Sequence, residues 1–173
     1  MPPPTEQRGE PGKPEYLFCA VWEGNWSPLL AVVVYRPPVV PLRSDRRFLR
    51  LLQTCSLDYS HKILMGDWNA DMQDETKADV HFMRGLESEL SLKLVNTGTS
   101  HHTASNDTCI DLLHVDVNDT VMVVTRTQPT FRSRHDILSV TIDIFKPMPP
   151  SSSYTFKSCN KISPVDINMY LQE

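Results

Sequence analysis

The sequence predicts an α+β fold, built as a layered β-sandwich flanked by helices. Runs of β-branched and aromatic residues recur at strand length, two segments carry apolar residues at helical spacing, and turn-forming residues separate neighbouring runs. Strands that pair locally, with helices on their flanks, favour packed sheets covered by helices. A chain of 173 residues with 40% hydrophobic and 22% charged residues has the composition of one ordinary globular domain.

The first predicted elements are two paired strands. Residues 1–15 are rich in Pro, Gly and Glu, which predicts a flexible lead-in. Residues 17–22 (LFCAVW) and 29–35 (LLAVVVY) are strand-like, and the turn-rich EGNWSP between them suits an antiparallel hairpin. The prolines of YRPPVVP then end the strand pattern.

Two amphipathic helices are expected. The apolar stripe of the first consists of Phe48, Leu51, Leu52 and Cys55. Ser44 is placed to cap this helix, and Asp45 falls in its first turn. The apolar stripe of the second consists of Phe82, Met83, Leu86 and Leu90.

The remaining strands follow in order, at 62–65, 92–96, 109–115, 120–125 and 138–145. The first of these ends at Gly66. DVND separates the third and fourth, which predicts a second hairpin. The last alternates strictly, which indicates one core face and one wet face. We therefore assign residues 16–146 to the domain, and 147–173 to a Pro/Ser linker and the start of a helix capped by Ser163.

Charge and cysteine content narrow the functional classes. The net charge of −4 argues against nonspecific electrostatic binding of the whole protein to nucleic acid. The arginines of residues 43–50 are interpreted as solvated surface residues. The four cysteines form no CxxC pair, so reduced thiols are expected. No apolar run approaches the ~18 residues that cross a bilayer. We expect an intracellular protein, cytoplasmic or nuclear and not secreted.

Polar residues at strand ends are the candidate catalytic groups. Asp67 and Asn69 follow a strand that reads as buried, Tyr35 closes another, Asp111 interrupts an apolar run, and His135 precedes the last strand. Each has a structural interpretation as well, because Asp and Asn populate turns and most histidines are satisfied polar residues. A carboxylate between Ile and Leu needs a partner, and a histidine is the natural one. Taken together and in this order, the functional interpretation is favoured.

Four of these stretches resemble a known superfamily. VVVYRPP, ILMGDWNAD, TCIDLLHVD and SRHDILSVTI, in that order over Tyr16 to Phe145, resemble the endonuclease/exonuclease/phosphatase superfamily, and within it the endonuclease of non-LTR retrotransposons. The tail YTFKSCNKISPVDINMYLQE is similar to the segment that links such an endonuclease to reverse transcriptase. The resemblance implies cleavage of DNA by Mg²⁺-dependent phosphodiester hydrolysis.

The resemblance also implies roles for the candidate residues. Asp67 would activate or position the attacking water, Asn69 would orient the phosphate, and Tyr35 would contact or stabilise it. Asp111 would hold His135 against a phosphate oxygen. The implied metal ligands are Asp67 and Asn69, and the candidates for binding phosphate or DNA are Arg36, Arg132 and Arg134.

The chain departs from the superfamily pattern in two places. Strands bearing an asparagine and a metal-binding glutamate would precede the tyrosine motif, so the fold is expected to lack its N-terminal strands. Arg134 replaces the aspartate of the usual Ser-Asp-His motif, and Asp136 is expected to point to the opposite face. An incomplete sandwich should be a marginal monomer with an exposed sheet edge open to self-association.

Three functional hypotheses follow. The first is a truncated retrotransposon-type endonuclease that nicks DNA. The second is a catalytically inactive remnant with at most weak binding of phosphate or nucleic acid. The third is a superfamily phosphatase acting on lipid or nucleotide phosphates, which the reverse-transcriptase-like tail disfavours. His101 and His102 are assigned to a polar loop without a role.

Overall fold

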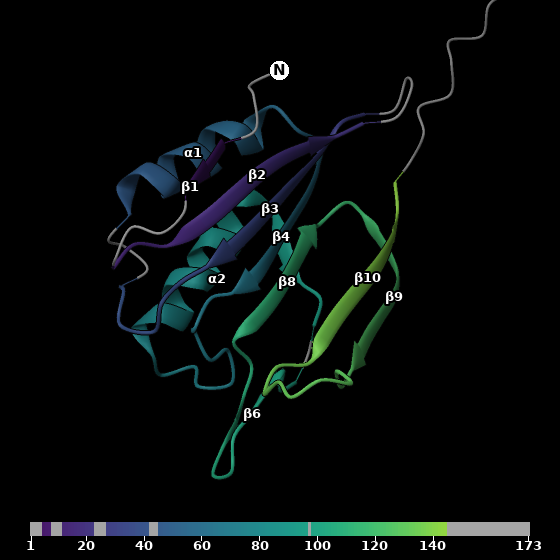
Figure 1. Cartoon of the computed structure of the whole chain (residues 1–173). Coiled ribbons are helices and arrows are strands. Elements are labelled where there is room, and N and C mark those ends of the chain that lie inside the picture. The colour runs from purple at the N-terminus through teal and green to yellow at the C-terminus, as the bar shows by residue number, and fades with distance from the viewer. Residues whose placement is uncertain (1–4, 8–11, 23–26, 42–44, 97, 145–173) are drawn as a thin grey trace, which may run out of the picture.

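A six-stranded mixed sheet forms the centre of the protein. The computed structural model describes residues 5–7, 12–22, 27–41, 45–96 and 98–144. Across the sheet the strands are β1 (Thr5–Gln7), β2 (Glu15–Val21), β3 (Leu29–Tyr35), β4 (His61–Asp67), β8 (Asp111–Asp116) and β5 (Leu92–Leu94). β3 and β4 pair in parallel, and the other neighbours pair antiparallel (Figure 1).

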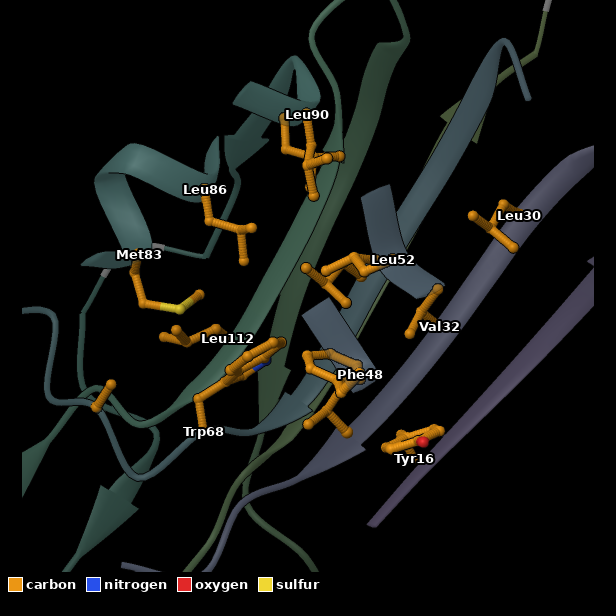
Figure 2. Packing of buried hydrophobic residues seen from close by; sticks show 14 of the residues in the cluster. Tyr16, Leu30, Val32, Phe48, Leu52, Trp68, Met83, Leu86, Leu90 and Leu112 are labelled. Atoms are coloured by element: carbon orange, nitrogen blue, oxygen red, sulfur yellow. The ribbon is translucent and has the colours of Figure 1, made fainter. Parts of the chain in front are cut away.

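Two helices within the described residues cover one face of this sheet. They are α1 (Arg46–Leu57), in the crossover from β3 to β4, and α2 (Ala78–Leu90), which precedes β5. The buried core lies between helices and sheet, where the rings of Phe48 and Trp68 lie 5.9 Å apart (Figure 2). Trp68 directly follows β4, so the core fixes the chain where that strand ends.

A two-stranded ribbon packs on the opposite face. It consists of β9 (Thr120–Thr127) and β10 (Ile137–Asp143), paired antiparallel. Neighbouring residues of a strand point to opposite faces. Leu64 and Leu112 accordingly lie in the helix-side core, whereas Ile63 and Leu113 pack with the ribbon. A short hairpin of β6 (His101–His102) and β7 (Asp107–Thr108) completes the described strands.

The structure confirms the α+β fold class and most of the predicted elements. The 17–22 and 29–35 strands pair antiparallel as β2 and β3, and both amphipathic helices form where expected. Cys19, Cys55 and Cys109 are free thiols. None of the helices in the described ranges is long and apolar enough to cross a membrane.

The predicted hairpin between residues 109–115 and 120–125 is wrong. The turn forms, with the amide of Asp119 donating to the carbonyl of Asp116, but the two strands belong to different sheets. β8 already pairs with β4 on one side and β5 on the other, so neither edge is free for β9. Partly buried side-chain contacts hold the turn to the start of β4: Nδ1 of His61 lies 2.6 Å from the Asp119 carboxylate, and Lys62 pairs with Asp116 at 2.7 Å.

Two smaller predictions also need correction. The N-cap of α1 is Asp45 and not Ser44, because the Asp45 carboxylate accepts the amide of Phe48 at 2.9 Å. The segment predicted as a flexible lead-in contains the edge strand β1. Ser44 and the predicted linker and helix of 147–173 lie outside the described residues.

Candidate active site

Three candidate residues form a row across the sheet. Tyr35 at the end of β3 is the register partner of Asp67 at the end of β4, and Asp67 is the partner of Asp111 at the start of β8. Cross-strand partners point to the same face. Asp67 alternates in phase with Ile63, so the row lies on the face that carries the β9–β10 ribbon.

Gly66 brings the strands together just before Asp67. Its φ is +135°, and a Cβ added there would lie 1.8 Å from the carbonyl oxygen of Val34. Any other residue would therefore push β3 away from β4 and be strained in this backbone conformation. The glycine that ends the predicted apolar strand is thus the residue that permits Tyr35 and Asp67 to lie side by side.

Asp67 and Asn69 are held by the turn that follows β4. The amide of Asn69 donates to Oδ1 of Asp67 at 3.0 Å, and Nδ2 of Asn69 donates to the carbonyl of Arg36 at 2.8 Å. Asn69 has a φ of +46°, a left-handed conformation that asparagine tolerates. Burial raises the pKa of Asp67 and the nearby Asp111 charge adds to this, although the Asn69 hydrogen bond and two imidazoles act in the opposite direction.

The predicted Asp111–His135 pair forms. Nδ1 of His135 lies 3.1 Å and 3.0 Å from the two carboxylate oxygens of Asp111. The Asp111 side chain is 17% exposed and that of His135 39%, so the pair is partly shielded from water while the imidazole remains accessible. With Nδ1 bonded to a carboxylate, Nε2 is the ring nitrogen left for a ligand.

A buried serine and a buried asparagine support Asp111. Ser100 donates from Oγ to Oδ2 of Asp111 at 2.9 Å and accepts the Asp111 amide at 3.1 Å. Asn96 donates to the Asp111 carbonyl at 2.8 Å and accepts the Leu113 amide at 2.6 Å. Neither Ser100 nor Asn96 was predicted to belong to the site. The position of Asn96 at the end of an apolar strand is a weak sequence signal for a site residue. Ser100 lies in the polar TGTSHH stretch, where no sequence signal points to a role in the site.

The assignment of Arg36 to phosphate or DNA binding is wrong. Arg36 is 2% exposed, and its guanidinium donates to the carbonyls of Trp68, Val40 and Asn69 and pairs with Asp79 at 3.0 Å. Its donors therefore hold the turn after β4 from the inside and cannot reach a ligand.

The other two arginines assigned to phosphate or DNA binding lie on the surface. Arg132 and Arg134 are both exposed, and Arg134 directly precedes His135. As expected, Asp136 does not join the Asp111–His135 pair, because its carboxylate bonds His102 at 3.0 Å and Arg126 at 3.4 Å. No carboxylate beside His135 along the chain therefore takes the place of the one that Arg134 replaces.

Asp67, Asp111 and His135 form a cluster that could hold a metal ion. One ligand atom from each lies within 4.8 Å of the others. Both oxygens of Asp111 already bond His135 and one also accepts Ser100, whereas Asp67 accepts a single backbone amide through Oδ1. Mg²⁺ binds through one or two carboxylates and keeps several waters. The donor set fits such an ion with Asp67 as its principal ligand.

Comparison with known proteins agrees with this arrangement at the level of fold. No protein-family profile and no curated protein sequence matches the chain. Among solved structures, it is similar to the endonuclease domain of TRAS1, a telomere-specific non-LTR retrotransposon, with a TM-score of 0.62 and 17% identity over 75% of this chain and 62% of that one.

A second similar structure is an endonuclease/exonuclease/phosphatase family protein from Leptotrichia buccalis, with a TM-score of 0.57 and 13% identity over 75% of this chain and 54% of that one. The chain thus spans less than two thirds of either protein. At these identities the likeness shows the fold alone, and it confirms the predicted resemblance at that level. The chain has the endonuclease/exonuclease/phosphatase fold.

Proposed function

We propose that the chain hydrolyses phosphodiester bonds in DNA, nicking one strand as a retrotransposon-type endonuclease would. The observation that carries the proposal is the row of Tyr35, Asp67 and Asp111, with His135 hydrogen-bonded to its end. These residues come from four separate stretches of sequence and meet on one face. The fold shared with the retrotransposon endonuclease domain supports the choice of substrate class.

Asp67 is proposed to act on the attacking water. Its carboxylate is partly buried, and burial raises its pKa, so its ionised form is a better proton acceptor than an ordinary aspartate. Oδ1 is occupied by the amide of Asn69, which leaves Oδ2 to bind the water. Asn69, fixed by its own bond to Arg36, orients the phosphate beside it.

The Asp111–His135 pair and Tyr35 are proposed to bind the phosphate oxygens. Asp111 accepts from Nδ1 of His135 and so fixes Nδ1 as a protonated nitrogen, and a doubly protonated ring would donate from Nε2 to a non-bridging oxygen. Tyr35 is 45% exposed and offers its hydroxyl from the other end of the row. Together these donors offset charge that develops on the phosphate in the transition state.

A divalent cation completes this proposal, with Asp67 and Asn69 as its protein ligands and Mg²⁺ as the ion. When bound, it would supply charge neutralisation at the phosphate and the leaving oxygen.

Arg132 and Arg134 would attract the DNA backbone on the exposed side of His135. An intracellular location and self-association through the sheet edge remain predictions.

Conversion of supercoiled plasmid to open circle in Mg²⁺ tests the proposal. Wild type should nick, whereas Asp67→Ala and His135→Ala should lose at least about a hundredfold in rate. Asp143→Ala and His81→Ala remove an exposed carboxylate and an exposed imidazole elsewhere and should leave the rate unchanged. Nicking that survives in Asp67→Ala or His135→Ala would contradict the assignment.

The alternative is a catalytically inactive remnant that retains weak phosphate binding. It is favoured by the commitment of Asp111 to His135 and Ser100, which leaves Asp67 as the chief carboxylate of the cluster for a cation. Isothermal titration with Mg²⁺ separates the two proposals. An active endonuclease should show a Mg²⁺-binding site that Asp67→Ala abolishes. An inactive remnant should release no heat of specific Mg²⁺ binding and should not nick DNA.

A further inference from the structure

His101 lies against the imidazole of His135. It is half-buried on β6, and the two ring centroids are 4.6 Å apart with the planes tilted by 46°. The two residues also form an isolated antiparallel β-bridge. Nδ1 of His101 is bonded to the Thr108 hydroxyl at 3.1 Å, so β7 holds the His101 ring in turn. The β6–β7 hairpin thus packs an aromatic ring on the candidate catalytic imidazole.

We propose that His101 is a positioning residue that fixes the plane of the His135 ring. The bonds from Asp111 reach His135 at Nδ1 alone, so the ring, attached to the chain at Cβ, can still turn about the line that joins Cβ to Nδ1. An aromatic ring at 4.6 Å lies within the range of favourable ring packing and blocks this rotation. Two independent restraints then direct Nε2 to one place.

The backbone around His101 is built to hold this contact. The amide of His102 donates to the carbonyl of Arg134 at 2.7 Å, and the amide of Asp136 donates to the carbonyl of Ser100 at 2.8 Å. These bonds flank the His101–His135 bridge on both sides. The side chains of His102 and Asp136 add a further contact at 3.0 Å. Hydrogen bonds on both sides of the ring contact therefore join the hairpin to the His135 segment.

Positioning through ring packing needs an aromatic side chain and not a second ionisable group. His101→Phe keeps the ring and removes both nitrogens, whereas His101→Ala removes the ring. Phenylalanine should therefore substitute for His101, and alanine should not. A direct contact of His101 with the phosphate requires the opposite, namely that both variants fail alike.

Histidine ring nitrogen–proton correlation spectra of the isotope-labelled full chain test this without reference to activity. His135 should show a single ordered ring, protonated at Nδ1, in wild type and in His101→Phe. In His101→Ala, the His135 signals should broaden or move toward those of exposed His81. His81→Ala, the matched control, should leave them unchanged. The proposal is overturned if alanine has no effect on His135, or if phenylalanine disturbs it as much as alanine.

The effect on catalysis rests on the proposed function and is read in the plasmid assay. His101→Ala should lower kcat by at least about tenfold with little change in KM, and His101→Phe should stay within about threefold of wild type. Amide spectra establish that both variants are folded. If wild type does not nick, the proposed function fails while the ring spectra still decide the positioning role.

Discussion

Replacing Gly66 with alanine tests the packing that places Asp67 beside Tyr35. The added Cβ would lie 1.8 Å from the oxygen, 2.8 Å from the carbon and 2.9 Å from the nitrogen of Val34. All three are backbone atoms of the neighbouring strand, so no side chain can rotate away to make room. Relief requires that β3 and β4 separate at the register pair directly before Tyr35 and Asp67.

The expected loss of stability can be worked from two contributions. A φ of +135° is unfavourable for alanine and costs about 1–3 kcal/mol, and forcing an extra methyl group into a packed site costs about 1–3 kcal/mol more. The sum of about 2–6 kcal/mol is a large part of the about 5–15 kcal/mol that stabilises a typical domain. For a chain of this size the melting temperature should fall by on the order of 10 °C.

Gly85 provides a matched control within the same chain. It is exposed inside α2, it lacks a positive φ, and a Cβ added there meets no atom within 4 Å. Gly85→Ala should stabilise the protein by about 0.5–1 kcal/mol, because alanine is the better helix former. Thermal and denaturant melts of both variants are the assay. Substitutions that shift the melting temperature in the same direction, or a Gly66→Ala shift within experimental error of zero, would refute the reasoning.

Two further predictions concern the site and the uncovered sheet face. Burial, followed by the charge of Asp111, raises the pKa of Asp67 in the folded protein. Ionised Asp67 therefore opposes folding above that pKa, and the penalty disappears as the pH falls below the unfolded value of about 3.9. Asp67→Asn should melt at a higher temperature than wild type at pH 7, and the difference should close near pH 4; a difference that does not change with pH contradicts this. The second prediction concerns self-association. On the uncovered face of the sheet, Val33 of β3 points outward and is 44% exposed, and β10 pairs only with β9 among the described strands, which leaves its other edge unpaired there. Sedimentation velocity should show association that grows with concentration and that Val33→Lys weakens, whereas a wild-type chain that stays monomeric at every concentration would refute it.

Local patterns were sufficient to predict most of the elements of this fold but not the pairing of all its strands. The β-branched and aromatic runs of β2 and β3 and the turn-rich EGNWSP between them predicted an antiparallel hairpin, and that pair formed. The same kind of signal joined residues 109–115 to 120–125 and was wrong there. The pairing of β8 depends on β4, more than forty residues earlier, and on β5. The sequence of the turn between β8 and β9 gives no indication that both edges of β8 are already paired.

The site shows the same division between local and distant signals. A carboxylate inside an apolar strand requires a partner, and this physical requirement correctly connected Asp111 with His135. Arg36 was misassigned because a surface arginine is the ordinary expectation. Its burial depends on carbonyls 32 and 33 residues away, which leave no pattern in the sequence. His101 and His102 were assigned together to a polar loop without a role, yet only His102 turns away, toward Asp107 and Asp136.

The distribution of charge across the row explains how two neighbouring carboxylates can coexist there. Asp67 and Asp111 are register partners, and their like charges would repel each other if both were unpaired. The imidazole of His135 and the hydroxyl of Ser100 satisfy Asp111, so the negative charge left for a cation or a water is mainly that of Asp67. On the other side of His135, exposed Arg134 adds positive charge where a further carboxylate would add negative charge. A site of this composition should bind phosphate more readily than it binds a cation, so Mg²⁺ affinity should rise when a phosphodiester is present. Titrating Mg²⁺ with and without a short uncleavable DNA duplex would reveal that coupling, and equal affinities in the two titrations would count against it.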